Sequence, residues 1–135
     1  MTKEEMLRLL TAAYTGPGSA AEGTFAGDVL RACADEKRID LILTTGGTGL
    51  SPRDVTPEAT ADVLEREIRA IPVAMWVEGL KVTPNAMLSR AVAGTRGSSL
   101  IVNLPGSEKA ARENLAAVLG ALEHALHMIA AEGHG

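Results

Sequence analysis

The sequence predicts a three-layer α/β/α protein in which a largely parallel sheet lies between two layers of helices. The stretch 40–44, Asp-Leu-Ile-Leu-Thr, is apolar without alternation, which is typical of a strand buried on both faces of a parallel sheet. After residue 24 the expected order is helix, strand, helix, further helices, a pair of strands and a long helix, the pattern of an α/β domain. A chain of 135 residues suffices for one such domain and is too short for two.

Each expected element has a local signal. Residues 1–23 are expected to hold an amphipathic helix over 3–14 and a loop rich in Gly, Pro and Ser, and residues 24–135 the α/β domain. Thr24, and the pairs Thr56-Pro57 and Thr83-Pro84, predict helix starts. The expected helices cover 25–36, 57–66, 72–81, a short segment from 84, and a long segment from a cap at Ser107 to about 131; the expected strands cover 40–44, 90–95 and 99–104.

Composition and charge argue against several functions. Hydrophobic residues make up 46% of the chain and aromatic residues 2%, so we expect a core of Leu, Val, Ile, Met and many Ala. A formal net charge of -4 argues against general nucleic-acid binding, so an anionic ligand must be held by local donors. The single cysteine, Cys33, excludes an internal disulfide and fits a reducing cytoplasm. We expect no membrane span and no leader, because apolar stretches are short and the first residues are acidic.

The segment 44–59, a polar loop rich in glycine between the expected strand and a helix, carries the strongest functional signal. Open α/β sheets bind ligands outside the carboxyl ends of their strands. Backbone amides and hydroxyls of this loop are expected to hold an anion; the candidates are Thr45, Gly46, Gly47, Thr48, Gly49 and Ser51. Arg53 offers a fork for a phosphate, and Asp54 a hard oxygen ligand for Mg²⁺. The structural alternatives are a tight turn, a surface arginine, and a carboxylate that caps a helix or forms a salt bridge.

A second candidate anion site lies at the start of the last helix. Free amides and the positive end of the helix dipole converge at Gly106 and Ser107, next to Pro105. The alternative is that Ser107 only caps its own helix. Two roles stay open for Asn103, which either holds a neighbouring loop through its amide or contacts the ligand directly.

Three segments resemble the signature of the molybdopterin-binding family of MogA/MoaB type. They are TTGGTG-x-x-x-RDVTPEA at 44–59, TP-x-A-x-LSR at 83–90 and NLPGS at 103–107, and the likeness runs from about residue 24 to 131. The resemblance implies a MogA/MoaB-like fold and a cytoplasmic enzyme that transfers AMP from Mg-ATP to the terminal phosphate of molybdopterin. It also implies that the glycine-rich loop holds the nucleotide, that Asp54 is catalytic and holds Mg²⁺, and that Gly106 and Ser107 hold the pterin phosphate.

The chain departs from this family at its N-terminus. Members open with a buried strand and an SDR-x-x-x-G loop, and they carry an important aspartate some twenty residues before the TTGGTG segment. The sequence of residues 1–23 contains neither the strand pattern nor the SDR-like loop, and Glu22 is the carboxylate nearest to the position expected for the aspartate. Glu108 stands where members usually carry proline. The alternative is therefore a non-catalytic molybdopterin-binding or assembly subunit that has lost part of the active site.

The remaining conspicuous residues favour self-association over metal binding. The family resemblance implies a trimer, and an apolar set too large for a small core supports an oligomer; its members are Ile68, Ile71, Val73, Met75, Trp76 and Val77. Trp76 is expected in the core or at a subunit contact. His124 and His127 share a helix face but lack further ligands, so we expect surface or interface histidines.

Overall fold

The computed structural model describes residues 23–133, so the helix expected over 3–14 and the loop that follows it lie outside the described residues. The helices are α3 (Gly23–Arg31), α4 (Thr56–Val63), α5 (Ala70–Leu80) and α6 (Glu108–Gly133), with a π-helical turn η2 (Ala32–Glu36) and a 3₁₀ turn η3 (Pro84–Leu88). The strands are β1 (Leu41–Thr45), β2 (Arg66–Glu67), β3 (Ala93–Arg96) and β4 (Ser99–Leu104). The helices and strands expected after residue 24 are therefore present, with shifted bounds. The helix expected over 57–66 ends at Val63, Arg66 belongs to the unexpected two-residue β2, and the strand expected from 90 begins at Ala93.

The described strands form one mixed sheet in the order β1-β4-β3-β2. β1 and β4 are parallel, with Leu41 opposite Leu100 and Thr45 opposite Leu104. β3 is antiparallel to both β4 and β2. The α/β class is confirmed, but the sheet is mixed rather than largely parallel. The reason is local: the turn after Arg96, with Gly97 at φ +55°, is too short for the crossover that a parallel pair needs.

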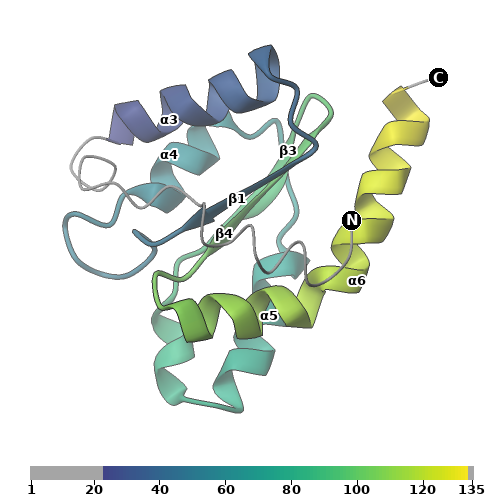
Figure 1. Ribbon diagram of the computed structural model, residues 1–135. Helices are drawn as coiled ribbons and strands as arrows, with labels where there is room; N and C mark the ends of the chain where they lie inside the picture. Colours follow the sequence, from purple (N-terminus) through teal and green to yellow (C-terminus); the bar gives the residue numbers. More distant parts are fainter. Residues whose placement is uncertain (1–22, 134–135) are drawn as a thin grey trace.

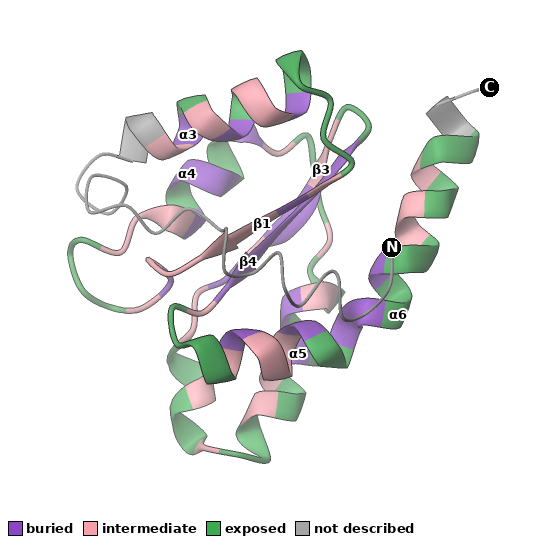
Figure 2. Cartoon of the chain, viewed as in Figure 1, coloured by how far each residue is buried: buried purple, intermediate pink, exposed green. Residues whose placement is uncertain are grey.

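Helices cover both faces of the sheet and give the three expected layers (Figure 1). α3 and α4 pack against one face, where Leu30, Val63 and Ile101 share a buried cluster. α5 and α6 cover the other face, where Met75 and Leu115 belong to a larger cluster. Figure 2 shows the buried sides of these helices turned toward the strands.

α6 departs from the expectation that no segment resembles a membrane span. Over Glu108–Ala131 it is, among the described helices, the one long and apolar enough to cross a membrane. A single helix of this kind is weak evidence for a membrane span, because mostly buried core helices of soluble proteins can have the same length and composition. Leu115, Val118 and Leu122 of α6 are buried in the core cluster, but only 22% of the apolar window is buried, so packing against the sheet accounts for only part of its apolar composition.

The helix starts match the predicted caps in part. Thr83 precedes η3, and its hydroxyl accepts a hydrogen bond from the Asn85 amide at 3.2 Å, as expected. Thr56 was expected to cap α4, but the capping position is held by Val55 and no side chain caps that helix. α3 begins at Gly23, one residue before the expected cap at Thr24.

Candidate functional site

The two candidate anion-binding loops lie side by side at one edge of the sheet. β1 and β4 are parallel neighbours, so the loops 46–55 and 105–107 leave from the same edge. The Gly46 amide donates to Leu104 O at 3.0 Å, and a Cβ on Gly106 would lie 3.3 Å from the Gly46 Cα. The fold thus brings together two motifs that are far apart in the sequence.

Glycine is required at two positions of the first loop. Gly46 and Gly47 have φ angles of +87° and +69°, in the left-handed region that favours glycine. A Cβ on Gly47 would also overlap the Thr56 hydroxyl, and the Thr56 amide donates to Gly47 O at 3.2 Å. The Thr56 side chain therefore faces the loop, which explains why it does not cap α4.

The other candidates of this loop differ in exposure. Thr48 is buried, so its hydroxyl lies away from the open surface of the loop. Thr45 and Gly49 are half-buried. Ser51 and Arg53 are exposed, and within the described residues the Arg53 guanidinium has no ion-pair partner. A phosphate could reach these two side chains without displacing any described contact.

Asp54 closes the tip of the loop. Its Oδ2 accepts a hydrogen bond from the Ser51 amide at 3.0 Å, and its own amide donates to Ser51 O at 2.8 Å. Asp54 is half-buried, has no ion pair within residues 23–133, and does not cap α4. Its contacts thus differ from both structural alternatives, and one carboxylate oxygen is left for a further partner.

Arg90 is a site residue that sequence reasoning missed. Its Nε donates to Gly49 O at 2.7 Å, its Nη2 to Asp54 O at 2.5 Å, and its Nη1 to Glu58 Oε2 at 2.6 Å. Its amide donates to Thr48 O at 2.8 Å. The only sequence signal was its place at the end of the TP-x-A-x-LSR segment, which gives no hint of contact with the glycine-rich loop.

Asn103 lies on β4 opposite Thr44 of β1 and is fully buried. Its Nδ2 donates to the hydroxyls of Thr44 at 2.8 Å and Thr60 at 3.0 Å, and its Oδ1 accepts from the Val92 amide at 3.1 Å. Both amide protons are used within the protein. Of the two roles left open for Asn103, these contacts match the first, because Val92 belongs to the loop between η3 and β3.

The second loop is held mainly by its own helix. Ser107 Oγ accepts a long hydrogen bond from the Ala110 amide, 3.4 Å, so Ser107 caps α6 as predicted. Glu108 pairs with Arg112 one turn later, at 3.0 Å. Arg112 therefore offsets part of the charge by which Glu108 would repel a phosphate at this helix start.

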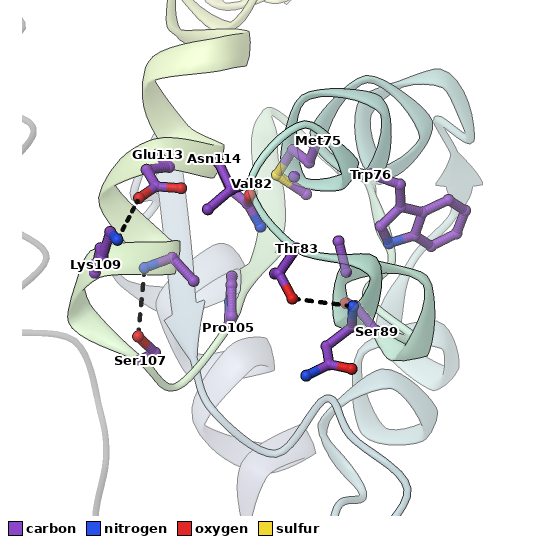
Figure 3. Close-up of a pocket in the computed structure, with 14 residues that line it drawn as sticks. Met75, Trp76, Val82, Thr83, Ser89, Pro105, Ser107, Lys109, Glu113 and Asn114 are labelled. Atoms are coloured by element: carbon purple, nitrogen blue, oxygen red, sulfur yellow. Dashed lines mark hydrogen bonds and ion pairs between the residues drawn. The ribbon is translucent and has the colours of Figure 1, made fainter.

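A pocket of about 400 Å³ opens beside the second loop, between α5, η3 and the start of α6 (Figure 3). Pro105 and Ser107 line it on one side, and Thr83 and Ser89 on the other. Lys109 lies at its wall, only loosely paired with Glu113 at 3.9 Å. Pattern reasoning missed this pocket because its walls come from three elements that no single motif spans.

Trp76 lines this pocket and is half-buried. Its Nε1 is buried without a hydrogen-bond partner in the described residues. His124 and His127 are exposed on α6, as expected, and no cluster of three or more metal-ligating side chains occurs within residues 23–133.

The opposite end of the sheet holds a separate ion pair. Arg96 binds both carboxylate oxygens of Asp35 at 3.0 and 2.8 Å and donates to Val63 O at 2.9 Å. The Arg96 hydrogen bonds lower the pKa of Asp35, and the same bonds raise the pKa of Arg96. This pair joins η2, α4 and β3 and lies away from both loops.

Comparison with known proteins bears on this site. The family model described as "Probable molybdopterin binding domain" matches residues 22–124. Gephyrin of Dictyostelium discoideum is 57% identical over 89 residues, which are 66% of this chain and 12% of gephyrin. The molybdopterin adenylyltransferase of Helicobacter pylori strain 26695 is 46% identical over 95 residues, 70% of this chain and 54% of that enzyme. The chain thus spans about half the length of this adenylyltransferase.

Solved structures of molybdopterin biosynthesis proteins also match this chain. The molybdopterin biosynthesis enzyme MoaB of Thermus thermophilus matches with a TM-score of 0.75 and 55% identity, over 79% of this chain and 67% of that one. The Mog protein of Mycobacterium ulcerans matches with a TM-score of 0.75 and 43% identity, over 78% and 69% of the two chains.

Proposed function

Since the chain belongs to the molybdopterin-binding domain family, we propose that it acts in molybdenum cofactor biosynthesis, binding molybdopterin and transferring AMP to it from Mg-ATP. The observation that carries this proposal is the meeting of the two glycine loops, where Gly46 and Gly106 come into contact. A phosphate held on one loop lies next to a phosphate held on the other. Relatives named molybdopterin adenylyltransferase support the same reaction.

The first loop takes the nucleotide in this proposal. Amides and hydroxyls along 45–51 bind its phosphates, and Arg53 supplies a guanidinium that forms no ion pair with the described residues. Asp54 suits Mg²⁺, which commonly takes only one or two carboxylates and completes its shell with phosphate oxygens and water. The ion, when bound, neutralises phosphate charge. Asp54 keeps a carboxylate oxygen available for it, because only Oδ2 is held by the Ser51 amide.

The second loop and its pocket take the pterin. The amides at the start of α6, with Ser107 and Lys109, bind the terminal phosphate. The pocket has apolar walls from Met75 and Val82 and polar groups on η3, a combination that suits a flat heterocycle with polar edges. An oxygen of the pterin phosphate attacks the α-phosphorus of ATP, and pyrophosphate leaves. Catalysis consists mainly of holding the two phosphates in line.

A second candidate function is a non-catalytic molybdopterin-binding or assembly subunit. The observation that favours it is that the sequence of residues 1–23 carries neither the SDR-x-x-x-G pattern nor the aspartate that the family places before the TTGGTG segment. Such a subunit keeps the pocket and the second loop and lacks turnover.

The deciding experiment supplies the purified chain with molybdopterin, ATP and Mg²⁺ and measures adenylylated pterin and pyrophosphate beside pterin binding. Turnover supports the enzyme, and binding without turnover supports the second candidate. A chain that binds neither pterin nor nucleotide contradicts both.

We also propose self-association, as a homotrimer, in the cytoplasm. Of the apolar residues first assigned to an interface, Met75 is buried and Ile68 and Ile71 pack against the core. Met75 and Ile71 lie on α5, and Ile68 lies in the segment between β2 and α5, where its amide donates to Ala93 O. An apolar patch on α5, η3 and the turn between them is exposed; its residues are Val73, Val77, Leu80, Val82, Met87 and Leu88. Such a patch favours contact between subunits.

We expect Val77→Lys to dissociate the oligomer, because it buries a charge in that contact. Light scattering at micromolar concentration checks this, with the exposed Ala116→Lys on α6 as control. A parent chain that is already monomeric contradicts the proposal.

A further inference from the structure

We propose that Arg90 is a positioning residue, which holds the Asp54 end of the glycine-rich loop, and with it the Asp54 carboxylate, in the binding conformation without touching the ligand. This inference rests on the proposed role of that loop in nucleotide binding.

The contacts of Arg90 span the whole loop. Its guanidinium binds the carbonyl oxygens of Gly49 and Asp54, near the two ends of the segment that carries Ser51 and Arg53. Its backbone amide binds Thr48 O. One residue, supplied by a distant part of the chain, thus fixes three carbonyls of a loop that has no regular secondary structure between β1 and α4.

These contacts set the direction in which Asp54 points. The Asp54 carbonyl is bound by Arg90, its amide by Ser51 O, and its carboxylate by the Ser51 amide. With the carbonyls drawn toward the guanidinium, the Asp54 side chain has little freedom to rotate away. Because Arg90 reaches Asp54 only through the main chain, its effect on a metal ion must pass through the position of that carboxylate.

Most of the N–H donors of the Arg90 guanidinium are used within the described protein. All three guanidinium nitrogens donate to protein oxygens, and the side chain is only about a third exposed, at 36%. Glu58 on α4 further fixes the plane of the guanidinium and offsets its charge. Arg53 is the opposite case, with an exposed and unpaired guanidinium among the described contacts.

A double-mutant cycle separates positioning from direct contact. Mg-ATP affinity is measured by calorimetry for the parent, Arg90→Gln, Asp54→Ala and the double variant. If Arg90 acts through Asp54, Arg90→Gln weakens Mg-ATP binding about tenfold and weakens ATP binding in EDTA less than twofold. In the double variant, the loss of Mg-ATP affinity should be no larger than in Asp54→Ala alone. A double variant whose loss of Mg-ATP affinity equals the product of the two single losses would contradict the proposal.

Arg96→Gln is the matched control for stability. Arg96 also binds a carboxylate and a carbonyl, but at the far end of the sheet. This variant should melt lower and keep the parent's Mg-ATP affinity. Arg90→Lys is the conservative second variant, which keeps the positive charge. Because lysine has a single nitrogen, it cannot hold the same carbonyls, so this variant should bind Mg-ATP as poorly as Arg90→Gln. Restored binding in Arg90→Lys would show that charge alone matters and would overturn the proposal.

A readout without nucleotide keeps this inference distinct from the proposed function. The Ser51 amide proton reports its bond to the Asp54 carboxylate in an NMR spectrum. Its resonance should move in Arg90→Gln to the position seen in Asp54→Ala and stay unchanged in Arg96→Gln. If the parent binds no Mg-ATP, the proposed function fails and this signal alone decides on Arg90. An unmoved Ser51 resonance in Arg90→Gln overturns the inference.

Discussion

The loops after β1 and β4 reach the same edge of the sheet but are held in different ways. The loop 46–55 is fixed by contacts from outside its own segment, through Arg90 and Thr56. The turn 105–107 is fixed by the helix it begins, through the Ser107 cap, and by close approach to Gly46. The comparison teaches that the first anion site depends on distant parts of the chain, whereas the second needs little more than a helix start.

The largest expected effect is at the tip of the first loop. Asp54→Ala should weaken Mg-ATP binding at least about a hundredfold, because a carboxylate that serves the ion is lost. The free energy of unfolding should fall by only about 1–2 kcal/mol, because one hydrogen bond to a charged group is lost. Calorimetry and urea unfolding measure the two, with the exposed Asp62→Ala as control. Unchanged Mg-ATP affinity would remove Asp54 from the site.

The second-largest expected effect concerns the backbone of the first loop. Gly47→Ala should weaken nucleotide binding about tenfold and cost about 2 kcal/mol, because alanine is strained at φ +69° and its Cβ meets Thr56. Gly120→Ala is the control, since a Cβ there meets nothing and helix propensity improves. Equal nucleotide affinity in the Gly47 variant and the parent would mean that the observed loop conformation is not the binding one.

Ser107→Gly tests whether the second loop does more than begin a helix. Glycine caps almost as well as serine, so the melting temperature should barely change. Loss of the hydroxyl should lower pterin affinity by about 1 kcal/mol or more, the contribution of a hydrogen bond to a charged group. Ser107→Ala should add a capping defect. Titration curves that match the parent would return Ser107 to a purely structural role.

The smallest expected effect concerns the charge beside that hydroxyl. Glu108→Gln should strengthen pterin binding about twofold, because the carboxylate repels a phosphate and the Arg112 pair offsets it only in part. The gain should shrink as salt is added. Glu123→Gln, exposed on α6 farther from the loop, serves as control. Weaker pterin binding in the Glu108 variant would contradict a phosphate at this helix start.

Local patterns predicted much of this structure. The apolar run at 40–44, the cap at Thr83 and the hairpin near Gly97 follow from interactions within a few residues, so sequence alone locates them. The glycine motifs also marked both loops, because left-handed backbone at Gly46 favours glycine and Gly106 approaches Gly46 closely.

What the patterns missed depends on tertiary contact. The hydrogen bonds of Arg90 to Gly49 and Asp54 join residues far apart in the sequence, and no local pattern around an arginine predicts such bonds. Thr56 has the sequence context of a cap, but contact with Gly47 decides its role. β2 has only two residues, and it forms by pairing with β3, which lies far along the sequence.

The central claim, that the two loops form one ligand site, is tested most directly by amide NMR of the ¹⁵N-labelled chain. Titration with Mg-ATP should shift the amides of 46–54 together with those of Gly106 and Ser107, because the loops touch through Gly46 and Gly106. Molybdopterin should then shift Ser107 and the η3 residues that line the pocket. Shifts confined to the opposite end of the sheet, around Asp35 and Arg96, would contradict the account.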